Sequence, residues 1–92
     1  MPYAQSVPGY DLEAHPGGLI LRARSGTTEH RLDRVSGLVY TFCDGRTSNC
    51  EIAGHLAMIL GDAAPGPKEM DRIITRLSLL GLVEVQPSAS AA

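Results

Sequence analysis

The residues of this chain that could do chemistry are two cysteines and a histidine, Cys43, Cys50 and His55. Thiolates and imidazoles are the usual ligands of zinc, which takes four of them in structural sites. Here the spacing is C-x6-C-x4-H, which no common zinc pattern uses, and no fourth ligand lies nearby in the sequence. Cysteine is also among the residue types most often buried. We therefore expect Cys43 to pack in a core, Cys50 to lie at the start of a helix, and no metal or other cofactor to be bound.

Patterns for nucleophilic catalysis are missing from the sequence as well. No serine stands in a G-x-S-x-G elbow, and no cysteine has an obvious neighbouring base. The glycines occur at expected turns and helix ends and do not form a phosphate-binding loop. His30 could change its charge near neutral pH, but it lies in a polar segment with no second catalytic group. The sequence therefore predicts a protein that is not an enzyme and that holds a partner.

Length and composition predict one small domain. The chain has 92 residues, of which 43% are hydrophobic and 20% charged, and this balance is typical of a globular protein with a modest core. The net charge of −2 argues against a polyanion as partner. No apolar run approaches the roughly 18 residues that a membrane span needs, and the first residues do not resemble a signal peptide. We expect a cytoplasmic domain that does not contact a membrane.

The first third of the chain has the period-2 pattern of strands. Apolar and polar residues alternate over residues 10–15 and again over 19–24, and Pro16-Gly17-Gly18 forms the break between them. Ser25-Gly26 has the two-residue spacing of a tight hairpin. It leads into residues 27–32, which tolerate a strand but are polar. Such a strand suits a sheet edge, where one row of main-chain groups is unpaired.

After this strand the period changes to that of a helix. Asp33 is suited to cap the first helix, because its carboxylate can accept from the free N–H groups of the first turn. Residues 35–42 carry apolar side chains on one helical face, and Gly45 is placed to end the helix in a left-handed conformation. Asp44-Gly45-Arg46 is therefore interpreted as a turn between two helices.

Two further helices and a short strand are predicted in the second half. Ser48 and Glu51 have the spacing of a capping box, and Pro67 suits the first turn of a helix. Gly61 and Gly81 mark the two helix ends. The apolar residues expected to be buried in these helices are Ile52, Leu56, Ile59, Leu60, Met70, Ile73, Ile74, Leu77 and Leu80. Residues 82–85 are long enough only for a short strand.

This order predicts an α+β fold of the winged helix-turn-helix type. It would consist of a three-stranded antiparallel sheet followed by three helices and a short C-terminal strand. Because three strands cannot bury their apolar face alone, the helices must pack across it. Residues 1–8 are expected to be a flexible N-terminal tail, residues 9–86 the folded domain, and residues 87–92 a disordered C-terminal tail.

Four short motifs in this order resemble the PqqD-like family. They are Leu32-Asp33, Phe42-Cys43-Asp44-Gly45, Glu51-Ile52-Ala53-Gly54-His55-Leu56 and Leu77-Ser78-Leu79-Leu80-Gly81-Leu82-Val83. The resemblance covers nearly the whole chain except the tails. It implies a RiPP recognition element, which is a peptide chaperone that binds the leader of a ribosomally made precursor peptide. Such a chaperone presents the leader to a modifying enzyme, which here would be a separate radical-SAM protein, cyclase, dehydratase or leader peptidase system.

The resemblance also implies where the leader would bind. In the family the leader adds as an extra strand to the third strand and lies against the third helix, a mode in which main-chain pairing gives affinity and side-chain pockets give specificity. The corresponding residues here are Thr27, Thr28, Glu29, His30, Arg31 and Leu32 on the strand and Arg72, Ile73, Arg76, Leu77 and Leu80 on the helix. The arginines suit acidic leader side chains. For the three apolar helix residues, burial in the core is the competing interpretation.

Two alternatives remain at this stage. A winged-helix regulator would bind DNA through the third helix, which offers Lys68, Arg72 and Arg76. The same helix also carries Glu69 and Asp71 and has no Asn or Gln, so nucleic acid is the less favoured partner. Exposed strand edges can also pair between copies of one chain, which leaves a homodimer open.

Overall fold

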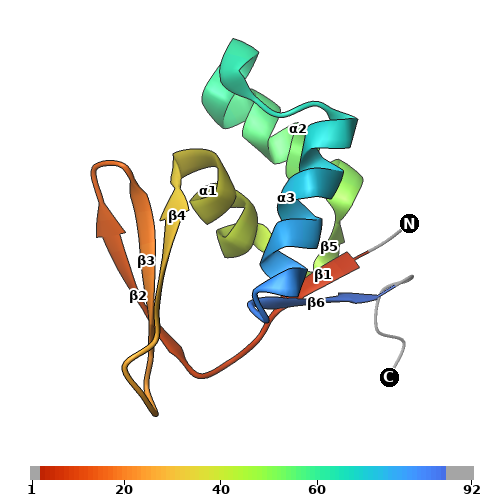
Figure 1. The fold of residues 1–92 in the computed structure, drawn as a ribbon. Helices are drawn as coiled ribbons and strands as arrows, with labels where there is room; N and C mark the ends of the chain where they lie inside the picture. The colour runs from red at the N-terminus through yellow and green to blue at the C-terminus, as the bar shows by residue number, and fades with distance from the viewer. Residues whose placement is uncertain (1–2, 87–92) are drawn as a thin grey trace.

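The computed structural model describes residues 3–86 as six strands, three α-helices and one short 3₁₀ helix (Figure 1). In chain order these are β1 (Tyr3–Ser6), β2 (Tyr10–His15), β3 (Gly18–Ala23), β4 (Glu29–Asp33), α1 (Arg34–Phe42), β5 (Asp44–Ser48), α2 (Asn49–Leu60), η1 (Gly61–Ala63), α3 (Pro67–Leu79) and β6 (Val83–Gln86). The predicted α+β class is confirmed. The label of winged helix-turn-helix stays a prediction.

The strands form two separate antiparallel sheets. One has the order β2-β3-β4 and corresponds to the sheet that the sequence predicts. The other has the order β5-β1-β6, so it joins the two ends of the described chain to a segment from its middle. In Figure 1 the helices lie between the two sheets, with α1 nearest to the β2-β3-β4 sheet. The sequence pattern indicates only the β6 strand of the second sheet.

The connection between β3 and β4 is longer than predicted. The sequence suggests a tight hairpin at Ser25-Gly26, but the chain leaves β3 after Ala23 and begins β4 at Glu29. Thr27 and Thr28 therefore lie in the connection and not in the strand. One main-chain hydrogen bond, from the Ala23 N–H to the Thr28 carbonyl (2.9 Å), closes the loop beyond the ends of both strands.

The prediction of a flexible tail over residues 1–8 is wrong for Tyr3–Ser6, which form β1. This strand is the centre of the second sheet and pairs with both β5 and β6. Ala4 is its only buried residue, so the sequence of β1 shows no clear alternation of buried and exposed side chains. The strand is recognised only by its pairing with β5 and β6. The predicted C-terminal tail, residues 87–92, lies outside the described residues.

The interpretation of Asp44-Gly45-Arg46 as a simple turn is also wrong, because these residues begin β5. The turn chemistry is present: the Asp44 carboxylate accepts from the main-chain N–H groups of Arg46 and Thr47, both at 2.8 Å. Gly45 has a φ of 76°, and a Cβ there would lie 2.9 Å from the Gln5 side-chain oxygen. The strand thus depends on β1, which comes from a distant part of the sequence.

The helix caps follow the sequence closely. Asp33 accepts from the Ser36 N–H (2.7 Å) at the start of α1, and Ser48 and Glu51 form both hydrogen bonds of a capping box at the start of α2. Pro67 lies in the first turn of α3. These caps fix where each helix begins. The Asp33 cap also places α1 directly after the end of β4.

A single core holds the sheets and helices together. Its buried apolar residues are Ala4, Leu21, Leu32, Val39, Tyr40, Cys43, Ile52, Leu56, Met70, Ile74, Leu77, Leu82 and Val83. The predictions of burial for Ile59 and Leu80 are wrong, because these side chains are 50% and 43% exposed. Both lie near helix ends, where the apolar stripe continues beyond the elements that cover it.

Gly18 on β3 provides a test of the close contact between the main chains of β3 and β4. Its φ is 150°, and a Cβ there would lie 2.6 Å from the Asp33 carbonyl carbon on the neighbouring strand. Gly18→Ala is therefore expected to lower the free energy of unfolding by about 1–3 kcal/mol. Gly26→Ala is the matched control, because nothing lies within 4 Å of its added Cβ. Equal denaturant midpoints for the two variants would contradict this packing.

Candidate functional site

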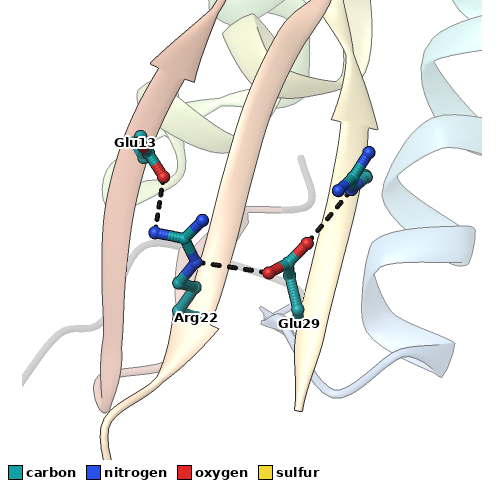
Figure 2. Close-up of polar contacts among 4 residues, drawn as sticks. Glu13, Arg22 and Glu29 are labelled. Atoms are coloured by element: carbon teal, nitrogen blue, oxygen red, sulfur yellow. Dashed lines mark hydrogen bonds and ion pairs between the residues drawn. The ribbon is translucent and has the colours of Figure 1, made fainter. Parts of the chain in front are cut away.

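The candidate site lies along the free edge of β4. This strand ends the order β2-β3-β4, so it has a strand neighbour on one side only. The helix that contacts β4 is α1, and α3 lies further out on the side of β4 that faces away from β3 (Figures 1 and 2). An edge strand beside a helix face has the geometry with which peptide-binding domains accept an added strand.

The register of β4 decides which of its main-chain groups point to β3. The hydrogen bond between Ala23 and Thr28 marks these opposed residues as a hydrogen-bonded pair. In an antiparallel ladder such pairs alternate with pairs that exchange no hydrogen bond. The register runs without a shift along the strand. The main-chain groups of His30 and Leu32 are therefore used within the sheet.

By the same alternation, Glu29 and Arg31 turn their N–H and C=O groups away from β3. They lie opposite Arg22 and Ile20, in the pairs that exchange no hydrogen bond. These groups form an unpaired row along the free edge, on the side of α3. An extended peptide placed there could donate to and accept from both residues without disturbing the existing sheet.

The helix side of the site is a face of α3. Glu69, Arg72, Ile73 and Arg76 line a cavity of about 290 Å³. Its opposite wall is formed by Asp33 at the end of β4 and by Val35 and Ser36 at the start of α1. These helix residues are spaced by three or four, so they share one helical face. Because α1 follows β4 directly, the cavity lies where the free edge of β4 ends.

The cations on this face have no ionic partner in the described part of the chain. Neither Arg72 nor Arg76 forms an ion pair among residues 3–86, and both residues are exposed. Glu69 and Asp33 line the same cavity, but the Asp33 carboxylate already caps α1. The guanidinium groups can therefore still bind a carboxylate from outside.

The structure divides the site residues predicted from the sequence into distinct groups. Glu29 and Arg31 supply the free main-chain edge, and Arg72, Ile73 and Arg76 line the cavity. The other predictions are corrected. Thr27 and Thr28 lie in the connection before β4, and Leu32 and Leu77 are core residues with 6% and 0% exposure. His30 is half-buried, with its ring edge-on to that of Tyr10 (5.9 Å between ring centroids), and Leu80 is exposed after the last turn of α3.

The outer face of the sheet carries a row of ion pairs that the sequence analysis did not identify. Arg22 on β3 contacts Glu13 on β2 (2.6 Å) and Glu29 on β4 (3.2 Å), and Arg31 contacts the other oxygen of Glu29 (3.0 Å) (Figure 2). The alternation of charge in the sequence is visible, but the register that aligns these residues is not. The side chains of Glu29 and Arg31 thus lie on the outer face, while their main-chain groups face the free edge.

This arrangement changes the acidity of Glu29. Hydrogen bonds from Arg31 and then Arg22 stabilise its ionised form and lower the pKa of the carboxyl group. A group whose pKa is lowered in the folded state stabilises the fold above its unfolded pKa. That contribution is lost as the pH falls through the lowered value. Because all of these side chains contact solvent, the contribution to stability is small.

The two cysteines are free thiols in different surroundings. Cys43 is buried, its thiol donates to the Val39 carbonyl (3.1 Å), and burial raises its pKa to about 12. It therefore stays protonated at neutral pH. Cys50 is exposed. Among residues 3–86, no group of three or more His, Cys, Asp and Glu residues is placed to hold a metal ion.

The pKa of Glu29 gives a direct test of the ion-pair row. We expect NMR titration of its side-chain carboxyl to give a pKa below the ordinary value of 4.5. Arg31→Ala should raise that pKa, because it removes the largest cause of the shift. Arg46→Ala is the control, since Arg46 makes no contact with Glu29. An unchanged Glu29 pKa in the Arg31 variant would show that the pair does not form in solution.

Comparisons with known proteins were made for the whole chain. No family model, no curated protein and no solved structure matches it. In residues 3–86 no helix has the length and apolar character needed to cross a membrane.

Proposed function

We propose that this protein binds an extended peptide as an additional strand on β4, against α3. The single observation that carries the proposal is the outward-facing main chain of Glu29 and Arg31, next to the cavity on α3. Two main-chain residues spaced by two match the repeat of an added antiparallel or parallel strand. The site offers main-chain hydrogen bonds and side-chain contacts to a peptide. A binding protein that is not an enzyme requires no more than these.

Charge supports a preference for acidic peptides. Arg31 ends the ion-pair row at the β4 edge, and its side chain is 76% exposed. The outer face carries acidic and basic side chains in turn across the strands, in the order Glu13, Arg22, Glu29 and Arg31. An acidic side chain on an added strand would continue this order next to Arg31. On the other face, next to α3, Arg72 and Arg76 could pair with a second carboxylate. Main-chain hydrogen bonds would thus give affinity, and the arginines would select the sequence.

The resemblance to the PqqD-like family supports a more specific function. In this proposal the peptide is the leader of a ribosomally made precursor, and the protein acts in the cytoplasm as a peptide chaperone for post-translational modification. It presents the leader to a separate modifying enzyme, of the radical-SAM, cyclase, dehydratase or leader peptidase type. The free edge of β4 and the cavity between α3 and the start of α1 agree with the binding mode that the resemblance implies.

Arg31→Pro tests strand addition, because proline removes the outward N–H but leaves the hydrogen bonds of His30 and Leu32 to β3 intact. We expect a tenfold or greater rise in the Kd for the leader of a precursor encoded beside this gene, measured by fluorescence anisotropy. Arg31→Ala separates the loss of the side chain from the loss of the N–H. Leu12→Pro, on the opposite edge, should leave the Kd unchanged. Wild-type affinity in the Arg31→Pro variant would contradict the proposed mode.

Charge reversal on α3 tests the choice of peptide. Arg72→Glu with Arg76→Glu should weaken binding of an acidic leader by about tenfold or more, since each reversal replaces attraction by repulsion worth on the order of 1 kcal/mol. Lys68→Glu changes the net charge as much as either single arginine reversal does and lies outside the cavity, so its effect should be much smaller than that of Arg72→Glu or Arg76→Glu alone. If Lys68→Glu weakens binding as much as each single arginine reversal, long-range attraction and not the site selects the peptide.

The alternative function is that of a DNA-binding regulator. The observation that favours it is the pair of exposed, unpaired arginines on α3, which could contact phosphates. Salt-dependent duplex binding that survives Arg31→Pro but not the α3 reversals would support this alternative. Peptide binding lost in Arg31→Pro would support the leader-binding proposal instead.

A further inference from the structure

The β2-β3-β4 sheet has a second free edge, on β2. The Arg24 N–H donates to the Gly9 carbonyl (3.0 Å), just beyond the ends of β2 and β3, and this bond sets the alternation for the pair. By that alternation, the main-chain groups of Tyr10, Leu12 and Ala14 point away from β3. They form an unpaired row on the edge of the sheet opposite to β4 (Figure 1).

The same residues offer apolar side chains to a neighbour. Leu12 lies on the face of the sheet that carries the core residue Leu21, yet it is 55% exposed. At the end of β2, Ala14 helps to line a cavity of about 300 Å³ against α1, which contributes Leu38 to its wall. An added strand would place alternate side chains over Leu12 and toward this cavity.

The outer face of this edge is acidic. Asp11 pairs with Arg24 (2.8 Å) and Glu13 with Arg22 (2.6 Å), so in residues 3–86 each carboxylate has its cation on the β3 side. The ion pairs of the outer face therefore end at β2 in acidic residues, of which Figure 2 shows Glu13. Opposite charges in cross-strand positions stabilise a sheet, and like charges destabilise it. The next strand that continues the alternation must be basic.

We propose that the free edge of β2 is a second docking site, which takes an extended segment of a partner protein with basic residues alternating with apolar ones. β3 shows the complementary pattern within this chain: Arg22 and Arg24 face the acidic residues of β2, and Leu21 and Ala23 face the other side. A second copy of β2 is a poorer partner, because it would place Asp11 and Glu13 against carboxylates of the same kind. This inference does not depend on the proposed function of β4.

The two edges thus select partners of opposite charge. The β2 edge ends the ion-pair row in carboxylates, whereas the β4 edge ends it in Arg31 and faces the arginines of α3. One small sheet could hold an acidic peptide on one side and a basic segment of another protein on the other. Because both are added strands on the same sheet, neither needs to displace the other.

The probe is a synthetic peptide with the sequence of residues 18–24, compared with the same peptide carrying glutamate in place of both arginines. We expect the arginine peptide to cause saturable shifts in the amide NMR signals of Tyr10, Leu12 and Ala14. The glutamate peptide should bind at least tenfold more weakly. Absent shifts, equal affinities, or shifts confined to Glu29 and Arg31 would overturn the proposal.

Two variants sharpen the result. Leu12→Pro removes an outward N–H and should abolish binding of the arginine peptide. Asp11→Lys with Glu13→Lys leaves the main chain unchanged and should reverse the preference in favour of the glutamate peptide. Unchanged preference in the double variant would overturn the proposal, even if the proline variant fails to fold. A dimer in light scattering that Leu12→Pro dissociates would also overturn it, because a second copy would then occupy the edge.

Discussion

The antiparallel pairing of β3 with its two neighbours is the constraint on which the other features depend. Once β3 is fixed against β2 and β4, the two-residue alternation of the ladder decides which main-chain groups are used and which face outward. The same alternation separates the buried side chains from the charged ones. Leu21, fully buried at the centre of β3, anchors this register to the core. A shift by one residue would expose Leu21 and turn the charged row inward, so the core strongly specifies the register.

The site is built from groups that the fold does not use. The main-chain groups of Glu29 and Arg31 that face outward make no hydrogen bond within the sheet. Arg72 and Arg76 lie on the exposed side of α3, opposite the side that the helix buries in the core. Their combination is suited to recognition, since it provides main-chain pairing and positive charge. The exposed ion pairs contribute little to stability, but they set the sign of the charge that each edge presents.

Local features of the structure could be predicted from the sequence, and distant ones could not. The strands of the first sheet, the caps at Asp33 and Ser48, and the limits of α3 follow from short patterns. The sequence does not reveal β1 and β5, because they form strands through pairing with distant segments: β5 with β1 across some forty residues, and β1 also with β6. For the site, the sequence located β4 and α3 correctly, but spacing alone could not separate buried Leu77 from the half-buried Ile73. The outward orientation of Glu29 and Arg31 depends on the length of the preceding loop, which the sequence pattern underestimated.

Amide hydrogen exchange along β4 tests the central claim most directly. The account predicts alternation in the free protein: slow exchange at His30 and Leu32, whose N–H groups bond to β3, and fast exchange at Glu29 and Arg31. Binding of the leader peptide should then slow exchange at Glu29 and Arg31 without changing the other two. Slow exchange at Glu29 and Arg31 in the free protein, or fast exchange that persists with bound peptide, would contradict strand addition on β4.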